Sequence, residues 1–576
     1  MTTMWGPELL AANRTRFRLW APGCETVTLE IDAGEAVAMT RDADGWFATE
    51  APVGAGARYR FRVADDLAIP DPASRAQAGD VHGWSIVVDP AGYRWRSEDW
   101  RGRPWEETIL YECHPGVMGG FAGVARALPA LADLGITAIE LMPVAAFSGT
   151  RNWGYDGVLA YAPAAAYGTP EDLKALVDAA HGLGLGVFLD VVYNHFGPDG
   201  NYLPTIAPAF FDEARHTPWG AAIAFGREEV AHFFIDNARM WIEQYRFDGL
   251  RFDAVHAIAD NRFLDRLAAE VRRGAGDRPV HLVLENESND PDRLGDLQFD
   301  AQWNDDFHNV LHVLLTDEDG AYYQDFADRP AERLARCLSE GFIYQGEGSP
   351  NHDGKPRGKP SAHLPPTRFV AFLQNHDQVG NRALGERLPL LTDTAKLKAA
   401  TALLLLCPQI PLLFMGEEEG SVSPFLFFTD FHDELADAVR EGRRKEFAKF
   451  PAFADPEQRE KIPDPNAHET FKASRAQPGD DAAAWRDLYR RLIALRHERI
   501  VPGLAGAAAT GADVFGDKAV IARWRLGDGA TLTLALNLGD AAVAVEAPAA
   551  AVLVRIGGGV ADGALAPASL VAWLGA

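Results

Sequence analysis

Hydrophobic and polar residues alternate position by position near both ends of the chain. The chain reads RYRFRV at 58–63 and LTLALNL at 532–538, and turn-forming stretches such as PVGAG (52–56) interrupt the first region. A period of two that is broken by turns is typical of half-buried antiparallel strands. We therefore predict an N-terminal β-sandwich over residues 1–92 and a C-terminal antiparallel β-domain over residues 506–576.

Between these ends, short apolar runs alternate with stretches of helical periodicity such as REEVAHFFIDNARMWIEQY (227–245). Eight runs are strand candidates: TILYEC (108–113), TAIELM (137–142), VFLDVV (187–192), FDGLRFDAVH (247–256), VHLVLE (280–285), FDAQW (299–303), RFVAFLQ (368–374) and IPLLFMG (410–416). Parallel strands need crossover helices, so eight such runs predict a closed (β/α)8 barrel, a TIM barrel of the α/β class, over residues 93–505. An open doubly wound sheet is the alternative, but no Gly-rich phosphate loop follows the first run.

Composition narrows the class of partner. The chain has 82 acidic and 55 basic residues, a net charge of −27. Such a surface repels phosphate backbones and anionic lipid, so we expect neither nucleic acid nor membrane as a partner. Its four cysteines are scattered without short spacings, which fits a reducing compartment. The chain also starts without a basic segment followed by an apolar core, so we expect no signal peptide and a cytoplasmic location.

Polar residues follow almost every predicted barrel strand, at the end where barrel enzymes carry their chemistry. They are His114, Asp190, Asn194, His195, Arg251, Asp253, Glu285, Asp305, Asp306, His376, Asp377 and Glu417. A single residue of this kind is readily explained as a helix cap or a solvated loop residue. This many at matching strand ends predict one shared site.

Within this set, Arg251 and Asp253 stand two residues apart in an apolar run. Residues two apart on a strand face the same way, so both should point into the barrel and its mouth. A guanidinium favours the ionised form of a nearby carboxyl group, and an anionic Asp there would be a good nucleophile. The alternative is a buried ion pair that only fixes the register of the strand.

The next predicted strand ends in a second carboxyl group, Glu285. An apolar surround and a neighbouring anion would raise its pKa, so that it could donate a proton. Glu287 has the same parity and is the alternative, but Glu285 directly terminates the strand. Asp377, in QNHD, adds a third carboxylate. One ionised and one protonated acid across a bond is the arrangement that glycoside hydrolysis requires, and adjacent-strand origin of Asp253 and Glu285 favours the retaining route.

The remaining residues of the set suit a sugar. His195 and His376 can hydrogen-bond hydroxyl groups, and Tyr155 offers a flat face to a pyranose ring. Three tryptophans could extend that surface, although core packing is the alternative for each: Trp153, Trp219 and Trp303. Histidine and carboxylate also suit a metal, but the chain has no His-x-His or His-Glu-x-x-His spacing, so we predict no metal.

Four stretches, in order along the chain, resemble the four short catalytic regions of the α-amylase superfamily of glycoside hydrolases: DVVYNH (190–195), GLRFDAVH (249–256), VLENESN (283–289) and FLQNHD (372–377). The resemblance implies that Asp253 is the nucleophile, Glu285 the general acid/base, and Asp377 a carboxylate that grips sugar hydroxyls. It further implies that Arg251, His195 and His376 contact Asp253 or the sugar, that Tyr155 stacks beneath the sugar, and that Asp190 and Asn194 support the site.

Further stretches resemble one family of this superfamily, the malto-oligosyltrehalose trehalohydrolases: AQWNDDFHNVLH (301–312), FIYQGE (342–347), NHDQVGNRALGERL (375–388), PFLFFTDF (424–431), VREGRRKEF (439–447) and PDPNAHETF (463–471). The resemblance extends to the N-terminal β-domain, which is similar to immunoglobulin-like carbohydrate-binding domains. It implies hydrolysis of the α-1,4 bond next to the terminal trehalose of maltooligosyl trehalose, with release of trehalose and a maltooligosaccharide and with no cofactor. It also implies a pathway link to the synthase that makes this substrate. A glycogen-branching or debranching enzyme is the alternative, and a non-catalytic glycan-binding protein is a remote one.

One stretch departs from the pattern of this family. After the first strand the chain reads PGVMGGFAGV (115–124), whereas the relatives carry a longer loop, which puts contacts at the outer sugar subsites in doubt. Selectivity for trehalose requires a pocket for two glucoses joined 1,1. We expect Asp305, Asp306 and Glu417, at the ends of the sixth and eighth strands, to contribute to it; solvation of the rim is the alternative for each.

Overall fold

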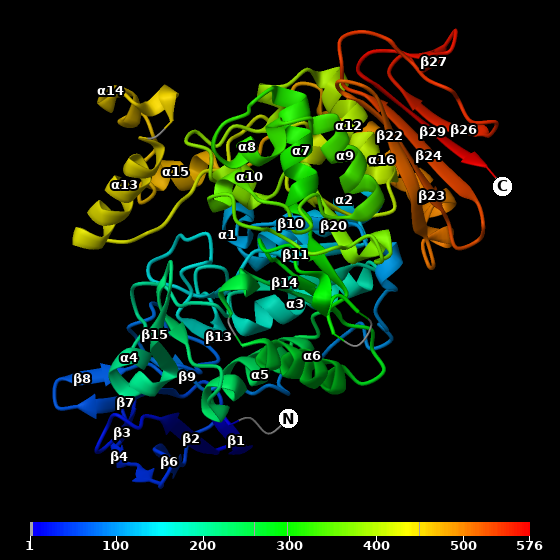
Figure 1. Cartoon of the computed structure of the whole chain (residues 1–576). Helices are drawn as coiled ribbons and strands as arrows, with labels where there is room; N and C mark the ends of the chain where they lie inside the picture. Colours follow the sequence, from blue (N-terminus) through cyan, green and yellow to red (C-terminus); the bar gives the residue numbers. More distant parts are fainter. Residues whose placement is uncertain (1–3, 259, 296–297, 449, 576) are drawn as a thin grey trace.

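The computed structural model of the chain describes residues 4–258, 260–295, 298–448 and 450–575. A small N-terminal β-domain, a central barrel and a C-terminal β-domain follow one another in space as they do in sequence (Figure 1). The two β-domains lie at opposite ends of the molecule, so the barrel separates them.

Two antiparallel sheets form the N-terminal domain. One has the order β1 (Glu8–Ala11), β2 (Arg14–Trp20), β6 (Trp46–Ala51), β5 (Thr40–Arg41); the other has the order β4 (Val37–Ala38), β3 (Thr28–Ile31), β7 (Arg58–Ala64), β8 (Leu67–Ile69), with β9 (Ser85–Ile86) beside β7. Phe17 and Tyr59, one from each sheet, are fully buried with ring centroids 4.7 Å apart. The alternating residues therefore meet between the sheets as a sandwich core. Trp5 joins this domain to the barrel, because its indole donates to the carbonyl of Glu229 (2.9 Å) on α5 (Glu228–Glu243).

The predicted (β/α)8 barrel is confirmed. Eight parallel strands close on themselves in sequence order: β10 (Leu110–Cys113), β11 (Ala138–Leu141), β14 (Gly186–Val191), β17 (Gly249–Phe252), β18 (His281–Leu284), β19 (Ala301–Trp303), β20 (Phe369–Ala371) and β21 (Ile410–Phe414). Each strand lies in one of the eight runs that the apolar pattern predicts, except that β14 begins one residue earlier, at Gly186.

Helices surround the barrel, with one exception. The connections carry α2 (Phe121–Leu134), α3 (Pro170–Gly182), α5 (Glu228–Glu243), α6 (Asn261–Ala275), α7 (Asp305–Thr316) with α9 (Pro330–Glu340), and α12 (Thr394–Leu406), and α16 (Ala482–Arg499) closes the ring. Between β18 and β19 the described residues form only the short 3₁₀ helix η4 (Pro291–Arg293). The described part of this connection therefore joins the two strands through a loop that contains one short 3₁₀ turn.

The interior of the barrel changes character along its axis. Near the amino-terminal ends of the strands, apolar side chains including Leu110, Ala138 and Phe188 form one buried cluster. Two positions further along the same three strands come the buried acidic residues Glu112, Glu140 and Asp190. Because residues two apart share a face, the apolar plug gives way to a charged layer directly below the mouth.

Insertions at the carboxyl ends of the strands build the mouth. The pair β12 (Ala145–Ala146) and β13 (Leu159–Pro163) follows β11, and the hairpin β15 (Phe211–Thr217) with β16 (Gly220–Ile223) follows β14. After β21 come α13 (Asp433–Phe447), α14 (Pro456–Arg459) and α15 (His468–Ala473), which project to one side of the barrel (Figure 1). Residues 433–447 form α13, whereas the preceding stretch 424–431 packs on the barrel, with Phe425 buried against Phe414 of β21 (ring centroids 5.1 Å).

The C-terminal domain is the predicted antiparallel one. Its main sheet has the order β22 (Ala508–Gly516), β23 (Ala519–Arg525), β24 (Thr531–Asn537), β29 (Ser569–Gly575), β26 (Ala551–Ile556); a smaller sheet has β25 (Val543–Ala544), β28 (Ala564–Leu565) and β27 (Val560–Ala561). The buried indole of Trp524 donates to the carbonyl of Leu338 on α9 (3.2 Å), which docks the main sheet against the barrel helices.

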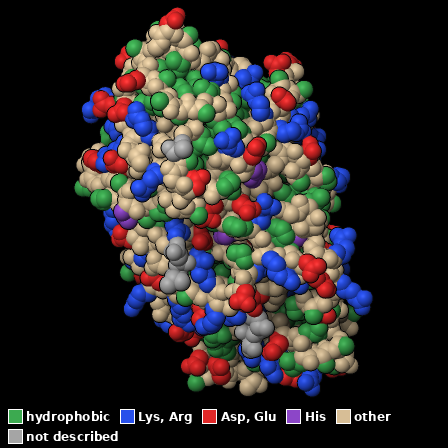
Figure 2. Space-filling model, turned by 90° about the vertical axis from the view of Figure 1, so that its right-hand side faces the viewer, with side chains coloured by type: hydrophobic (Ala, Val, Ile, Leu, Met, Phe, Trp, Pro, Cys, Tyr) green, Lys and Arg blue, Asp and Glu red, His purple; other side chains and the backbone are tan. Residues whose placement is uncertain are grey.

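Acidic and basic side chains are interspersed from end to end on the face shown in Figure 2. On that face the net negative charge is therefore spread out and does not form a block of one sign. Among the described residues, no helix is both long and apolar enough to cross a membrane.

Candidate active site

Arg251 on β17 lies at the centre of the charged layer. Its guanidinium is fully buried, and Nη1 donates to Asp190 Oδ2 and to Asp253 Oδ1, each at 2.7 Å. Nη2 lies 3.8 Å from Glu285 Oε2, and the guanidinium sits 4.2 Å above the ring of Trp303. Burial alone would lower the pKa of Arg251, but Asp190 and the other acidic neighbours raise it well above its usual value. One permanent cation thus holds three carboxyl groups from three adjacent strands.

The backbone after β17 is bent to bring the second acid close. Ala254, which follows Asp253, adopts a left-handed conformation (φ 42°) that a residue with a Cβ rarely takes. In this conformation its N–H donates to Glu285 Oε2 at 2.6 Å. Strained backbone of this kind is concentrated at functional sites, and here it ties the ends of β17 and β18 together beside both carboxyl groups.

Glu285 and its rival Glu287 have very different surroundings. Burial raises the pKa of Glu285 and Asp253 adds to the effect, while Arg251 opposes it. Glu287 has a side chain 57% exposed, and its carboxylate faces His352 (3.2 Å) and His256 (3.7 Å) on the surface. Of the two, Glu285 alone shares the guanidinium with Asp253.

Asp377 reaches the site from the helix α10 (His376–Gly380), which the side chain of Asn375 caps by accepting from the N–H groups of Asp377 (2.9 Å) and Gln378 (3.2 Å). The side chain of Asp377 is 45% exposed, so it is open to a ligand. Tyr155 stacks on the His376 ring (5.0 Å, 22°) and donates to Asp190 Oδ2 (2.7 Å). The structure therefore brings these residues together around Arg251.

His195 and Asn194 close the neighbouring side of the site. His195 Nε2 is 2.9 Å from the carbonyl of Tyr155, and burial lowers the pKa of its imidazole. Its ring stacks on Trp219 (4.5 Å, 8°), which the β15–β16 hairpin presents with 47% of its surface exposed. Asn194 is buried, and its side-chain amide has no hydrogen-bond partner within the described chain.

Asp305 and Asp306 begin α7 side by side but point to different places, because successive helical residues are about 100° apart. Burial raises the pKa of Asp305 to about 8, and Glu285 and Asp377 add to this, so Asp305 lies with the catalytic-site acids. Asp306 turns away from them: it pairs with Arg357 (3.2 Å) and accepts from the backbone N–H of Ile343 (2.7 Å). Asp306 thus fixes loops, contrary to the expectation that it lines the sugar pocket.

Glu417, at the end of β21, also lies apart from the set. It is 7% exposed, accepts from the amide of Gln374 (3.2 Å), and lies 3.5 Å from the hydroxyl of Tyr489 on α16. Burial raises its pKa to about 8. The expectation that Glu417 contacts trehalose is not met by this geometry, because the short helix η8 (Glu417–Glu419) turns the side chain toward the outer helices.

Two interior acids were missed by reading only the strand ends. Glu112 on β10 and Glu140 on β11 lie one step below the mouth and are each 1% exposed. The signal was present, because alternation within LYEC and AIEL puts both glutamates on the same side as the residues of the barrel interior.

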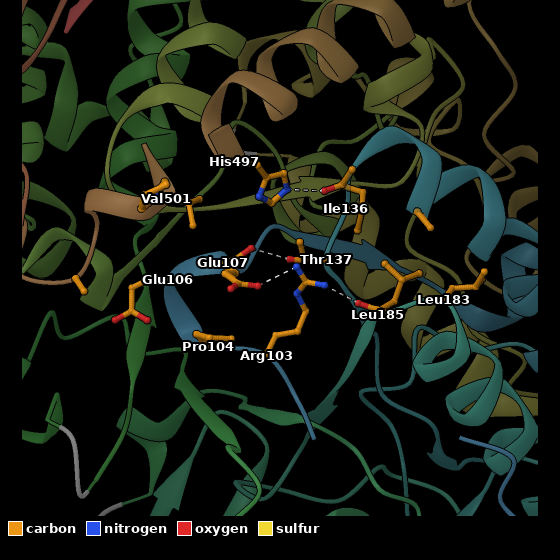
Figure 3. A pocket seen from close by; sticks show the side chains of 15 residues that line it. Arg103, Pro104, Glu106, Glu107, Ile136, Thr137, Leu183, Leu185, His497 and Val501 are labelled. Atoms are coloured by element: carbon orange, nitrogen blue, oxygen red, sulfur yellow. Dashed lines mark hydrogen bonds and ion pairs between the residues drawn. The ribbon is translucent and has the colours of Figure 1, made fainter. Parts of the chain in front are cut away.

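A cavity of about 670 Å³ lies at the other end of the barrel (Figure 3). Its polar groups contact one another: Arg103 pairs with Glu107 (2.8 Å), and His497 lies 2.9 Å from the carbonyl of Gly135. The convergence of charged groups, and not cavity size, therefore identifies the site. Within the described residues, no group of three or more His, Cys, Asp or Glu side chains is arranged to hold a metal.

Chemically, the site offers an anion on a buried guanidinium, a neighbouring acid with a raised pKa, and a third open carboxylate. This combination can protonate a leaving oxygen while attacking the carbon that bears it, which is the chemistry of acetal cleavage.

Comparison with known proteins agrees with this chemistry. Residues 78–207 match the family model "Alpha amylase, catalytic domain", and residues 507–573 match a domain of unknown function, DUF3459. A malto-oligosyltrehalose trehalohydrolase from Deinococcus radiodurans is 43% identical over 86% of this chain and 83% of its own length. Another from Rhizobium sp. (strain M-11) is 39% identical over 93% of each chain. A crystal structure from Salmonella typhimurium, provisionally named an α-amylase, has a TM-score of 0.95 and 46% identity over the whole of both chains.

Proposed function

The chain belongs to the malto-oligosyltrehalose trehalohydrolase family of α-amylase-type glycoside hydrolases, and on this premise we propose that it cleaves the α-1,4-glucosidic bond next to the terminal trehalose of maltooligosyl trehalose. The products are trehalose and a shortened maltooligosaccharide. The observation that carries the proposal is the buried guanidinium of Arg251, which holds Asp253 at 2.7 Å and Glu285 at 3.8 Å.

The reaction proceeds in two steps. In the first, Glu285 gives its proton to the glycosidic oxygen, a carboxylate oxygen of Asp253 bonds to the anomeric carbon, and the bond to the trehalose oxygen breaks. In the second, water gives a proton to Glu285 and attacks the same carbon, which releases Asp253 and restores the α configuration. The raised pKa of Glu285 suits this exchange, because more of the acid is protonated near neutrality than for an ordinary glutamic acid.

The surrounding residues bind the sugar that reacts. Asp377 and His376 offer an open carboxylate and an imidazole N–H to its hydroxyl groups, and the face of Tyr155 lies beside them. Asp190 supports Arg251 by accepting from its guanidinium at 2.7 Å, whereas the buried amide of Asn194 has no hydrogen-bond partner within the described chain. Asp305, close to Glu285 and Asp377, is the remaining candidate for contacts with the trehalose unit. We place the enzyme in the cytoplasm, downstream of the synthase that forms maltooligosyl trehalose.

Product analysis tests this function. The enzyme is incubated with maltooligosyl trehalose and, in parallel, with a plain maltooligosaccharide of the same length. We expect rapid release of trehalose from the first and slow attack on the second. Equal cleavage of both would indicate a general amylase, new branch points would indicate a branching enzyme, and no turnover of either would indicate a glycan-binding protein.

The stereochemical course tests the mechanism separately. Proton NMR during the first minutes of the reaction distinguishes the anomers of the new reducing end. The two-step route requires the α-anomer first, and a β-anomer as first product would exclude Asp253 as a nucleophile.

A further inference from the structure

Glu112 and Glu140 are neighbours in the charged layer of the barrel, and only one of them has partners. They face each other in the register of the adjacent strands β10 and β11, and each is 1% exposed. Glu112 contacts His376, whereas neither carboxyl oxygen of Glu140 has a hydrogen-bond partner among the described residues. The two residues therefore allow a comparison between a carboxyl group with hydrogen-bond partners and one without them among the described residues.

Glu112 binds His376 at two points. Its Oε1 lies 2.5 Å from the ring nitrogen Nδ1, and its Oε2 accepts from the backbone N–H of the same residue at 3.0 Å. His376 is the first residue of α10, so this grip fixes both the ring and the start of the helix that carries Asp377. The interaction joins the first and seventh strands of the barrel across the site.

The other ring nitrogen of His376 faces Asp377, whose side chain is 45% exposed. Nε2 lies 3.5 Å from Asp377 Oδ1. With an acceptor at each nitrogen, only the doubly protonated ring can donate on both sides. Burial would lower the pKa of His376, but Asp377 and Glu112 outweigh it and raise the pKa to about 9. An imidazolium is therefore expected across the physiological pH range.

We propose that Glu112 is a positioning residue that holds His376 as a fixed imidazolium, whose Nε2–H donates to the sugar beside Asp377. This inference rests on the proposed function for the identity of the ligand, but the Glu112–His376 contact is independent of it. In this arrangement a charge-assisted donor, and not a neutral imidazole, meets the hydroxyl group of the reacting sugar.

Several elements place titratable groups near His376. They contribute Glu112 from β10, Glu140 from β11, Asp190 and Arg251 from β14 and β17, Asp377 from α10 itself, and Tyr155 and His114 from nearby loops. Arg251 opposes a second positive charge, so the two carboxylates in direct contact must outweigh it. Burial lowers the pKa of His114 to about 4, so that imidazole is neutral and adds no charge.

Glu140 provides the matched control. Burial raises its pKa well above the usual range, and the anions of Glu112 and Asp190 add to this. A neutral carboxyl group and a glutamine amide have nearly the same shape and no charge. Glu140→Gln should therefore leave the site unchanged, whereas Glu112→Gln removes an anion from His376.

The test is an NMR titration of full-length protein labelled at histidine Cε1, with the His376 signal assigned by its absence in His376→Gln. In the unsubstituted protein and in Glu140→Gln we expect His376 to stay protonated through pH 8. In Glu112→Gln its midpoint should fall by about 1–3 units, the usual effect of losing an opposite charge in contact. A neutral His376 at pH 7.5 in the unsubstituted protein would overturn the inference, and so would an unchanged midpoint in Glu112→Gln. The first of these outcomes does not depend on Glu112→Gln, so the test survives if that variant does not fold.

Kinetics give a second reading. With α-maltosyl fluoride, whose fluoride leaves without a proton from Glu285, kcat/KM of Glu112→Gln should fall about tenfold per pH unit above the new His376 midpoint. A purely structural role for Glu112 would lower kcat/KM equally at every pH. Failure of the proposed function would show as absence of trehalose release by the unsubstituted protein and would leave the NMR titration intact.

Discussion

Two buried arginines lie near the carboxyl ends of the barrel strands, and each has carboxyl groups and an aromatic ring close by. Arg251 on β17 lies over Trp303, and Arg387, after β20, lies over Phe414 (4.9 Å). Arg251 donates directly to carboxylates. Arg387 donates instead to backbone carbonyls, those of Ser423 (2.7 Å) and Met415 (2.9 Å).

The acids beside Arg387 accordingly have neutral partners. Glu417 contacts Gln374, and Glu418 accepts from the hydroxyl of Tyr111 (2.9 Å). Burial raises the pKa of Glu417 to about 8 and that of Glu418 to about 7. Around Arg251, where the ion pairs are direct and a ligand can reach them, these residue types form a reactive site. Arg387, Glu417 and Glu418, here called the enclosed cluster, have no direct ion pair among the described residues and form a largely neutral scaffold. The following changes test this difference.

Asp253→Asn should have the largest effect. Removing the nucleophile removes the two-step route, so kcat on maltooligosyl trehalose should fall on the order of 10⁴-fold or more, with circular dichroism and Tm close to those of the unsubstituted protein. Glu417→Gln is the matched change in the enclosed cluster and should keep kcat and KM within about twofold. Similar losses in both variants would contradict the distinction.

Glu285→Gln should come next. Loss of the general acid should cost about 10²–10⁴-fold in kcat/KM on maltooligosyl trehalose. The cost should be much smaller with α-maltosyl fluoride, because fluoride is a good leaving group. A penalty of equal size on both substrates would mean that Glu285 acts on something other than the leaving oxygen.

The dependence of the free energy of unfolding on pH should reveal the raised pKa of Glu417 in the enclosed cluster. A carboxyl group with a folded pKa near 8 binds more protons in the folded than in the unfolded state between about pH 4.5 and 8, so its contribution is full below 4.5 and is lost as pH rises to 8. Urea unfolding should detect this as a loss of about 5 kcal/mol in the free energy of unfolding. In Glu417→Gln this part of the decline should disappear, and an unaltered slope would show that Glu417 is ionised in the fold.

Tyr111→Phe should have the smallest effect. It removes the hydroxyl that donates to Glu418 and accepts from the N–H of Gly416 (3.2 Å). The free energy of unfolding should fall by about 1–2 kcal/mol, the usual cost of a buried hydrogen bond, with kcat unchanged. A large loss of kcat would show that the enclosed cluster is coupled to Asp253 and Glu285.

Much of this architecture was predictable because the barrel strands are buried on both faces and read as short apolar runs. The eight runs were enough to predict the fold. Because polar residues follow these runs at one end of the barrel, the sequence also predicted that Asp253, Glu285 and Asp377 lie in one site. The missing helix between β18 and β19 was less visible, since loop length alone does not determine whether a connection coils.

The direction in which each side chain points could not be predicted from the sequence. Asp305 and Asp306 are adjacent and identical in type, and only the start of α7 decides which of them meets Glu285. Glu417 was misplaced for the same reason, because η8 turns it outward. Glu112 and Glu140 were overlooked, although the alternation of residues in their strands places both side chains in the barrel interior. Burying a carboxyl group costs free energy unless it has a partner, so such residues are not expected inside a strand when their partners are unknown.

The step from an apolar plug to a charged layer also bears on how the chain finds its fold. A strand that slips by two residues keeps its inward and outward faces, so hydrophobic burial alone distinguishes such a slip poorly from the correct pairing. In β10, β11 and β14, however, the same slip would drive a carboxyl group into the plug or lift an apolar side chain into the ionic layer, and the cost of burying an unpaired charge would count against it. We therefore expect the acidic residues of the barrel interior to disfavour slipped strand pairings during folding. Variants that neutralise several of them at once should yield more misfolded chains during refolding, quite apart from any change in catalysis.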